Sequence, residues 1–262
     1  MAKKSEADLR TDINKAIEIY QPITFVTFYL SDYGEMVVKL ISESILRRFE
    51  RFDMMEIVYT AAKELIINAT KANIKRVLFH DRNLNPDNPE QYAEGLRLFK
   101  DELNEDNVRK YVPKFRAQNL PVHATFYYSP EVLNIKVKNA FPLLPQEEKR
   151  IRDKFYKARS FSSLIDFYTE YSDDTEGAGL GLTMVGILLD NTGIDRHAFT
   201  LYSNKIYNET AAKLEIPLTD TYVSKRRRFE IEREDRGLSA DELRHQFQAK
   251  SIEPYTGPTT AG

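Results

Sequence analysis

The chain has no cysteine and no tryptophan, and only four histidines among its 262 residues. The absence of cysteine excludes disulfides, thiolate metal sites and cysteine nucleophiles, and it is typical of a reducing compartment. Lysine and arginine (38) nearly balance aspartate and glutamate (40), which leaves a net charge of −2. No overall electrostatic field therefore recruits nucleic acid or an anionic membrane.

Long hydrophobic runs are also missing. No apolar stretch approaches the roughly 20 residues that cross a bilayer. The first residues, Met-Ala-Lys-Lys-Ser-Glu-Ala-Asp, lack the apolar centre of a signal peptide. We expect a cytoplasmic protein with no membrane insertion and no nucleic-acid partner.

Hydrophobic periodicity predicts a mixed α and β chain in three parts. These are a helix–strand–helix extension (1–52), a main domain (53–219) with an insertion at about 80–120, and a charged tail (220–262). Helices are expected at about 5–19, 35–49, 53–73, 92–114, 146–158 and 182–191. Strands are expected at 23–30, 122–128, 132–138, 197–202 and 210–216.

Three side chains of the helix at 53–73 form a candidate binding face. Glu64, Asn68 and Lys71 follow helical spacing, so an acid, an amide and a cation share one side of the helix. Asn68 has apolar neighbours, and an amide in such surroundings needs partners. The alternative is an ordinary solvated helix face.

A glycine-rich segment provides the second motif. Its sequence, Gly-Ala-Gly-Leu-Gly-Leu, spans 177–182 and runs into a predicted helix. Unobstructed amides beside a helix N-terminus form a cradle for phosphate. The alternative is a tight turn that serves packing alone.

Together the two motifs resemble those of the histidine-kinase-like ATPase superfamily, which includes DNA gyrase, sensor histidine kinases and anti-sigma-factor serine kinases. The resemblance covers about residues 53–219. It implies an α+β, two-layer α/β sandwich, in which a mixed, mostly antiparallel sheet has helices on one face (the Bergerat ATP-binding fold). It also implies ATP and Mg²⁺ as cofactors.

The resemblance also implies roles for individual residues. Asn68 would carry Mg²⁺, Lys71 would approach the phosphates, and Glu64 would orient the attacking group. Thr210 would help to hold the water that binds adenine. The segment that matches the glycine-rich box of sensor kinases contributes Gly177, Gly179, Leu180, Gly181 and Leu182.

One motif departs from the family pattern. Where the family has Asp-x-Gly-x-Gly, this chain reads Asn139-Ala140-Phe141-Pro142-Leu143. Asn139 can still accept a hydrogen bond from the adenine amino group, although without charge assistance. Phe141 and Leu143 replace both glycines and crowd a place where the backbone should approach the ligand.

The histidines narrow the class of enzyme. None precedes His80, so the chain lacks an upstream phosphoacceptor histidine, and the spacing of the four predicts no metal site. The leading hypothesis is a kinase that transfers phosphate from Mg-ATP to serine, threonine or histidine of a partner protein. A degenerate binding scaffold and an ATP-driven clamp are the alternatives, and a homodimer through residues 1–50 is left open.

Overall fold

The computed structural model describes residues 3–103, 105–158, 185–186, 188–189, 192–195 and 198–243. Its described helices are α1 (Glu6–Glu18), α2 (Asp32–Arg48), α3 (Met55–Asp81), α4 (Pro89–Asp101), α5 (Glu105–Ala117), α6 (Pro145–Ala158) and α9 (Lys225–Arg236), with a short 3-10 helix η1 (Phe52–Met54). Its strands are β1 (Ile23–Thr27), β2 (Val122–Tyr128), β3 (Val132–Asn139), β4 (Phe199–Asn204) and β5 (Glu209–Pro217).

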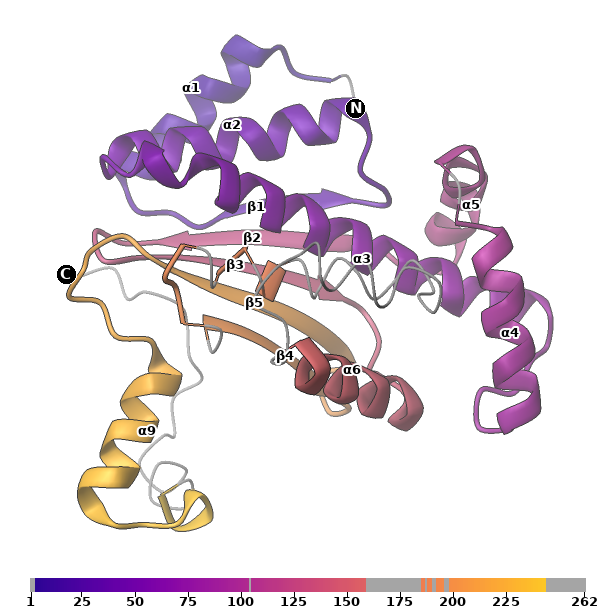
Figure 1. The fold of residues 1–262 in the computed structure, drawn as a ribbon. Helices are drawn as coiled ribbons and strands as arrows, with labels where there is room; N and C mark the ends of the chain where they lie inside the picture. The colour runs from indigo at the N-terminus through magenta and orange to yellow at the C-terminus, as the bar shows by residue number, and fades with distance from the viewer. Residues whose placement is uncertain are drawn as a thin grey trace.

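The strands form one five-stranded sheet in the order β1-β2-β3-β5-β4, and every described pairing is antiparallel. Helices α2 and α3 lie over one face of this sheet, and α1 packs beside α2 (Figure 1). The predicted α+β fold with a helix-covered, antiparallel sheet is confirmed. None of the helices in the described ranges is both long and apolar enough to cross a membrane.

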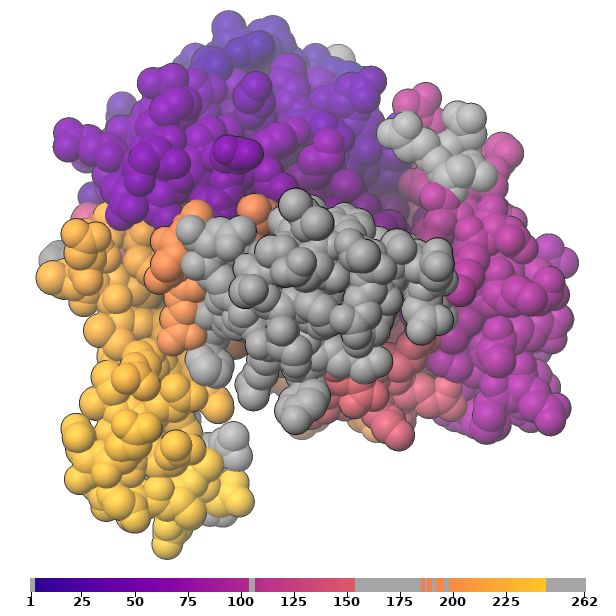
Figure 2. Space-filling model, in the orientation of Figure 1, coloured from indigo at the N-terminus to yellow at the C-terminus, as the bar shows by residue number. Residues whose placement is uncertain are grey.

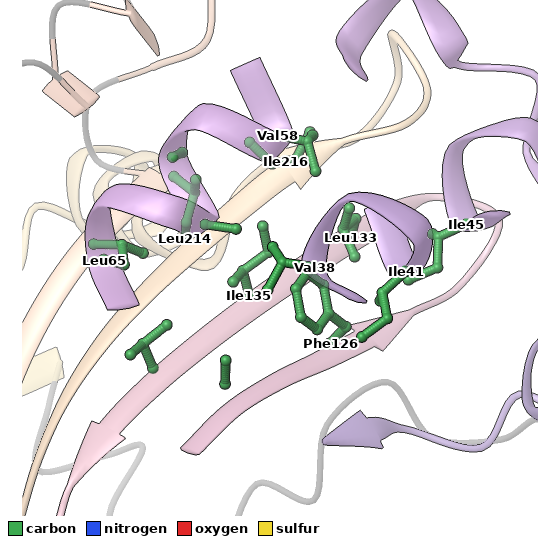
Figure 3. Close-up of a cluster of buried hydrophobic side chains, with 14 of the residues drawn as sticks. Val38, Ile41, Ile45, Val58, Leu65, Phe126, Leu133, Ile135, Leu214 and Ile216 are labelled. Carbon is green, nitrogen blue, oxygen red and sulfur yellow. The ribbon is translucent and has the colours of Figure 1, made fainter. Parts of the chain in front are cut away.

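The main core lies between α2, α3 and the sheet. Figure 3 shows Val38 and Ile41 of α2 beside Phe126 of β2, and these three belong to one core with Leu65 of α3 and Ile135 of β3. Phe126 and Ile135 are direct cross-strand partners, so their side chains lie on the same face of the sheet. Residues 1–52 belong to this same core, since β1 pairs with β2 and side chains from α1 and α2 are buried in it.

A second core forms around the insertion. Helix α3 has 27 residues and continues past the predicted end at 73, and its last turns pack against α4 and α5. The insertion is two helices rather than the single one expected at 92–114. Gly95 of α4 is needed for this contact, because a Cβ at that position would come within 2.4 Å of the Phe79 ring. Figure 2 shows the insertion, in magenta, at the opposite side of the molecule from α9, in yellow.

Candidate functional site

Helix α3 brings Glu64, Asn68 and Lys71 together on one side, as the spacing predicts. The Asn68 side-chain nitrogen (Nδ2) donates a hydrogen bond of 3.0 Å to Glu64 Oε1. A carboxylate oxygen only accepts, so the amide nitrogen has to face Glu64 and the amide oxygen points away from it. That oxygen, Asn68 Oδ1, is buried and has no hydrogen-bond partner within the part of the chain that the structure describes.

Lys71 completes the group. Burial lowers the pKa of its ammonium, and the negative charge of Glu64 opposes the shift. A partly buried cation and a buried, unsatisfied oxygen therefore lie on the same helix side as a carboxylate. Such an arrangement favours a polar ligand, because buried polar atoms without partners are rare in native proteins.

The structure also brings Asn139 and Thr210 to this helix. They are direct cross-strand partners at the end of β3 and the start of β5, and both are buried. Asn139 Nδ2 donates to the carbonyl oxygen of Ala69 at 2.9 Å and to Asn73 Oδ1 at 2.7 Å. Since Ala69 follows Asn68 directly, the predicted adenine side of the site lies against the same turn of α3.

These contacts give Asn139 a structural role that sequence reasoning missed. Its amide nitrogen is engaged by α3, which leaves only the amide oxygen for the expected contact with adenine. Asn73 in turn donates from Nδ2 to the Leu120 carbonyl oxygen at 2.7 Å. The two amides thus join β3, α3 and Leu120, two residues before β2, in one buried network. An amide at 73, between apolar residues of a predicted core helix, is the signal that could have indicated it.

The segment 140–144, which stands where the family has its glycines, is held by side chains. A backbone atom of each of its residues bonds to a side chain. Three carbonyl oxygens accept: Ala140 O from Asn208 Nδ2 (3.1 Å), Phe141 O from Thr210 Oγ1 (2.8 Å) and Pro142 O from Arg76 Nη2 (3.0 Å). Two amides donate: Leu143 N to Ser203 Oγ (2.8 Å) and Leu144 N to Glu147 Oε2 (3.0 Å). The Phe141 ring lies under the Arg76 guanidinium, 4.8 Å from ring centroid to Cζ. Hydrogen bonds to α3, α6, β4 and β5 therefore fix the conformation of this segment.

A buried ion cluster adjoins this segment. Glu147 of α6 lies 3.2 Å from Lys75 Nζ and 2.7 Å from Arg76 Nη2, and all three side chains are at most one-fifth exposed. Burial alone would raise the pKa of Glu147, but the two cations hold it below its ordinary value. Sequence reasoning missed this cluster, since its partners lie about seventy positions apart.

The glycine-rich segment cannot be placed. Gly177, Gly179, Leu180, Gly181 and Leu182 lie outside the described residues, as do His197 and His245. The predicted helix after them is helical at its four described positions, and Val185 and Leu189 are buried in the main core. Among the residues that the structure describes, no group of three or more metal-binding side chains is found.

Comparisons with known proteins give one informative relative. No family model and no solved structure matches the chain. An uncharacterized protein of Treponema pallidum (strain Nichols) is 30% identical over 205 residues, which are 78% of this chain and 39% of that protein. The chain thus spans about 39% of the length of this relative.

Proposed function

We propose that the chain is a cytoplasmic, ATP-binding signalling protein of the histidine-kinase-like ATPase class, which transfers a phosphoryl group from Mg-ATP to a partner protein. The observation that carries the proposal is the buried Oδ1 atom of Asn68. The hydrogen bond from Asn68 Nδ2 to Glu64 orients this oxygen away from Glu64, and it has no partner among the described residues.

Mg²⁺ fits this atom. A carboxamide oxygen is a hard ligand, and Mg²⁺ usually keeps several waters and takes further oxygens from nucleotide phosphates. One protein oxygen therefore suffices, and the bound ion would neutralise phosphate charge. Asn68 would hold the ion, and Lys71, one turn further along α3, would contact the phosphates.

Glu64 supports the transfer step. Phosphoryl transfer needs positioning and charge stabilisation more than covalent chemistry from the protein. The Glu64 carboxylate is held by Asn68 and lies beside the proposed phosphate position, so it would orient the hydroxyl or imidazole of the partner and accept its proton.

The test is a calorimetric titration with ATP and ADP, each with and without Mg²⁺. Wild type should bind ATP more tightly with Mg²⁺, and Asn68→Ala should remove that difference. Transfer from labelled ATP to candidate partners should be lost in Glu64→Gln, while Glu56→Gln, an exposed position two turns earlier on α3, should keep it. Equal Mg²⁺ dependence in Asn68→Ala and wild type would contradict the proposal.

A degenerate scaffold is the second candidate, and the segment that follows Asn139 favours it. Phe141 and Leu143 occupy two positions where the family has glycine, and side chains hold the backbone of this segment in place. If wild type binds neither nucleotide at millimolar concentration in the same titration, the chain serves as a binding scaffold and the partner surface is its functional site.

A further inference from the structure

Glu147 joins helix α3 to the segment 140–144 that follows Asn139. It lies in the first turn of α6, and its side chain is 9% exposed. One carboxylate oxygen accepts from Lys75; the other accepts from Arg76 and from the Leu144 backbone amide, which is 3.0 Å away.

The two cations that bind Glu147 also contact other parts of the structure. Arg76 donates to the Pro142 carbonyl oxygen and lies over the Phe141 ring. The Lys75 ammonium lies 5.6 Å from the centroid of the Phe99 ring in the insertion. Glu147 thereby fixes segment 140–144 from two directions, directly through Leu144 and indirectly through Arg76.

Within the part of the chain that the structure describes, this segment is bonded to the adenine side of the proposed site. Thr210 donates to the Phe141 carbonyl oxygen, and Thr210 pairs across the sheet with Asn139. Asn68 and Lys71 lie earlier on α3, whereas the hydrogen bonds of Glu147 run to Lys75, Arg76 and Leu144. A displacement of the segment would therefore alter the surroundings of the base and leave the phosphate ligands in place.

We infer that Glu147 is a positioning residue that holds segment 140–144 and thereby sets the base-binding side of the nucleotide site. The inference rests on the proposed function. It also explains how the chain can replace two glycines with Phe141 and Leu143, since the larger side chains come with their own buried anchor. The ligand that depends on Glu147 is the nucleobase end of an adenine nucleotide.

The test compares two substitutions on the same helix. Glu147→Gln keeps the size of the side chain, removes the charge that binds Lys75 and Arg76, and weakens the acceptor for the Leu144 amide, because an amide oxygen accepts less strongly than a carboxylate. Glu148→Gln changes the adjacent residue, which is exposed and pairs only with Arg152 in the described structure. Each variant is titrated with Mg-ATP and with Mg-tripolyphosphate, a probe that has phosphates and no base.

Glu147→Gln should weaken Mg-ATP binding about tenfold and change the tripolyphosphate affinity by less than about twofold. Glu148→Gln should change neither. Arg76→Lys keeps the charge but loses the planar contact with Phe141, and it should give the same pattern as Glu147→Gln. Equal weakening of both ligands, or no weakening of either, would overturn the inference.

Amide hydrogen exchange separates this inference from the proposed function. The amides of Leu143 and Leu144 should exchange faster in Glu147→Gln than in wild type or Glu148→Gln, with or without ligand. Unchanged exchange would overturn the inference even if ATP binds. If wild type binds neither probe, the proposed function fails, and the exchange result alone decides whether Glu147 positions the segment.

Discussion

Replacement of Asn139 by aspartate should destabilise the fold, although the sequence alone predicts a favourable effect of this change on ATP binding. The family has aspartate at this position, so Asn139→Asp would be expected to strengthen the adenine contact. In the structure, however, the Asn139 amide nitrogen donates to Ala69 O and Asn73 Oδ1. An ionised carboxylate cannot donate, so it would face two acceptor oxygens in a buried site.

The magnitude follows from the burial of these atoms. A buried polar group left without its partner costs about 1–3 kcal/mol, and an unpaired buried charge costs about 3–5 kcal/mol. We therefore expect the free energy of unfolding to fall by about 4 kcal/mol at pH 7, a large part of the total of a typical domain.

The loss should depend on pH with a defined sign. Burial and facing acceptors raise the folded-state pKa of the introduced aspartate above its unfolded value of about 3.9. The folded state then favours the protonated form, which can donate one hydrogen bond. The loss should be smallest below about pH 4, where one of the two hydrogen bonds can still form, and should grow as the pH rises through the folded pKa.

Urea unfolding at pH 5 and pH 7 measures both effects, with Asn208→Asp as the control. Asn208 also donates through its amide to a backbone carbonyl oxygen, that of Ala140, but it is exposed. Its substitution should cost less than about 1 kcal/mol, the value of an ordinary exposed hydrogen bond. If Asn139→Asp is as stable as wild type at pH 7, or if its loss equals that of Asn208→Asp, the reasoning is refuted.

Three further predictions concern stability. Asn68→Ala should raise the free energy of unfolding of the ligand-free protein by about 1 kcal/mol, because it removes a buried unsatisfied oxygen and adds helix propensity; a loss in urea unfolding would contradict this. Gly95→Ala should destabilise by about 1–3 kcal/mol through its clash with a phenyl ring, whereas Gly186→Ala, with no atom of the described residues within 4 Å of the added Cβ, should not lower the melting temperature. Burial would raise the pKa of Glu215, but its hydrogen-bond partners lower it, so this carboxylate stabilises the fold above about pH 4.5 and the stabilisation is lost as the pH falls. The free energy of unfolding should therefore fall less steeply with acid in Glu215→Gln than in wild type, whereas Glu131→Gln, at an exposed position, should match wild type.

The parts of the fold that the sequence predicted are those set by local periodicity. The buried stripe of α3 through Ile57, Ala61 and Leu65 follows helical spacing, and β2 alternates buried and half-buried residues along its length. The approach of Glu64 to Asn68 is also local, because one helical turn separates them. These features require only short-range geometry, so a single sequence contains them.

The missed features depend on contacts between distant residues. Asn139 meets Asn73 across 66 positions and Glu147 meets Lys75 across 72, and no spacing rule predicts such encounters. The sequence of the charged insertion did not predict the second core, because that core forms only when side chains of α4 and α5 pack against the last turns of α3. The role of the glycine-rich segment stays a prediction.

The position of β1 at the edge of the sheet has a consequence for how the chain is made. Thr24 of β1 and Thr125 of β2 hydrogen-bond to each other although they are 101 positions apart. At a synthesis rate of about 5–20 residues per second, β1 leaves the ribosome roughly 5–20 s before its partner strand. During that interval the apolar sides of α1 and α2 have no sheet to cover, so the nascent chain exposes this surface until β2 emerges.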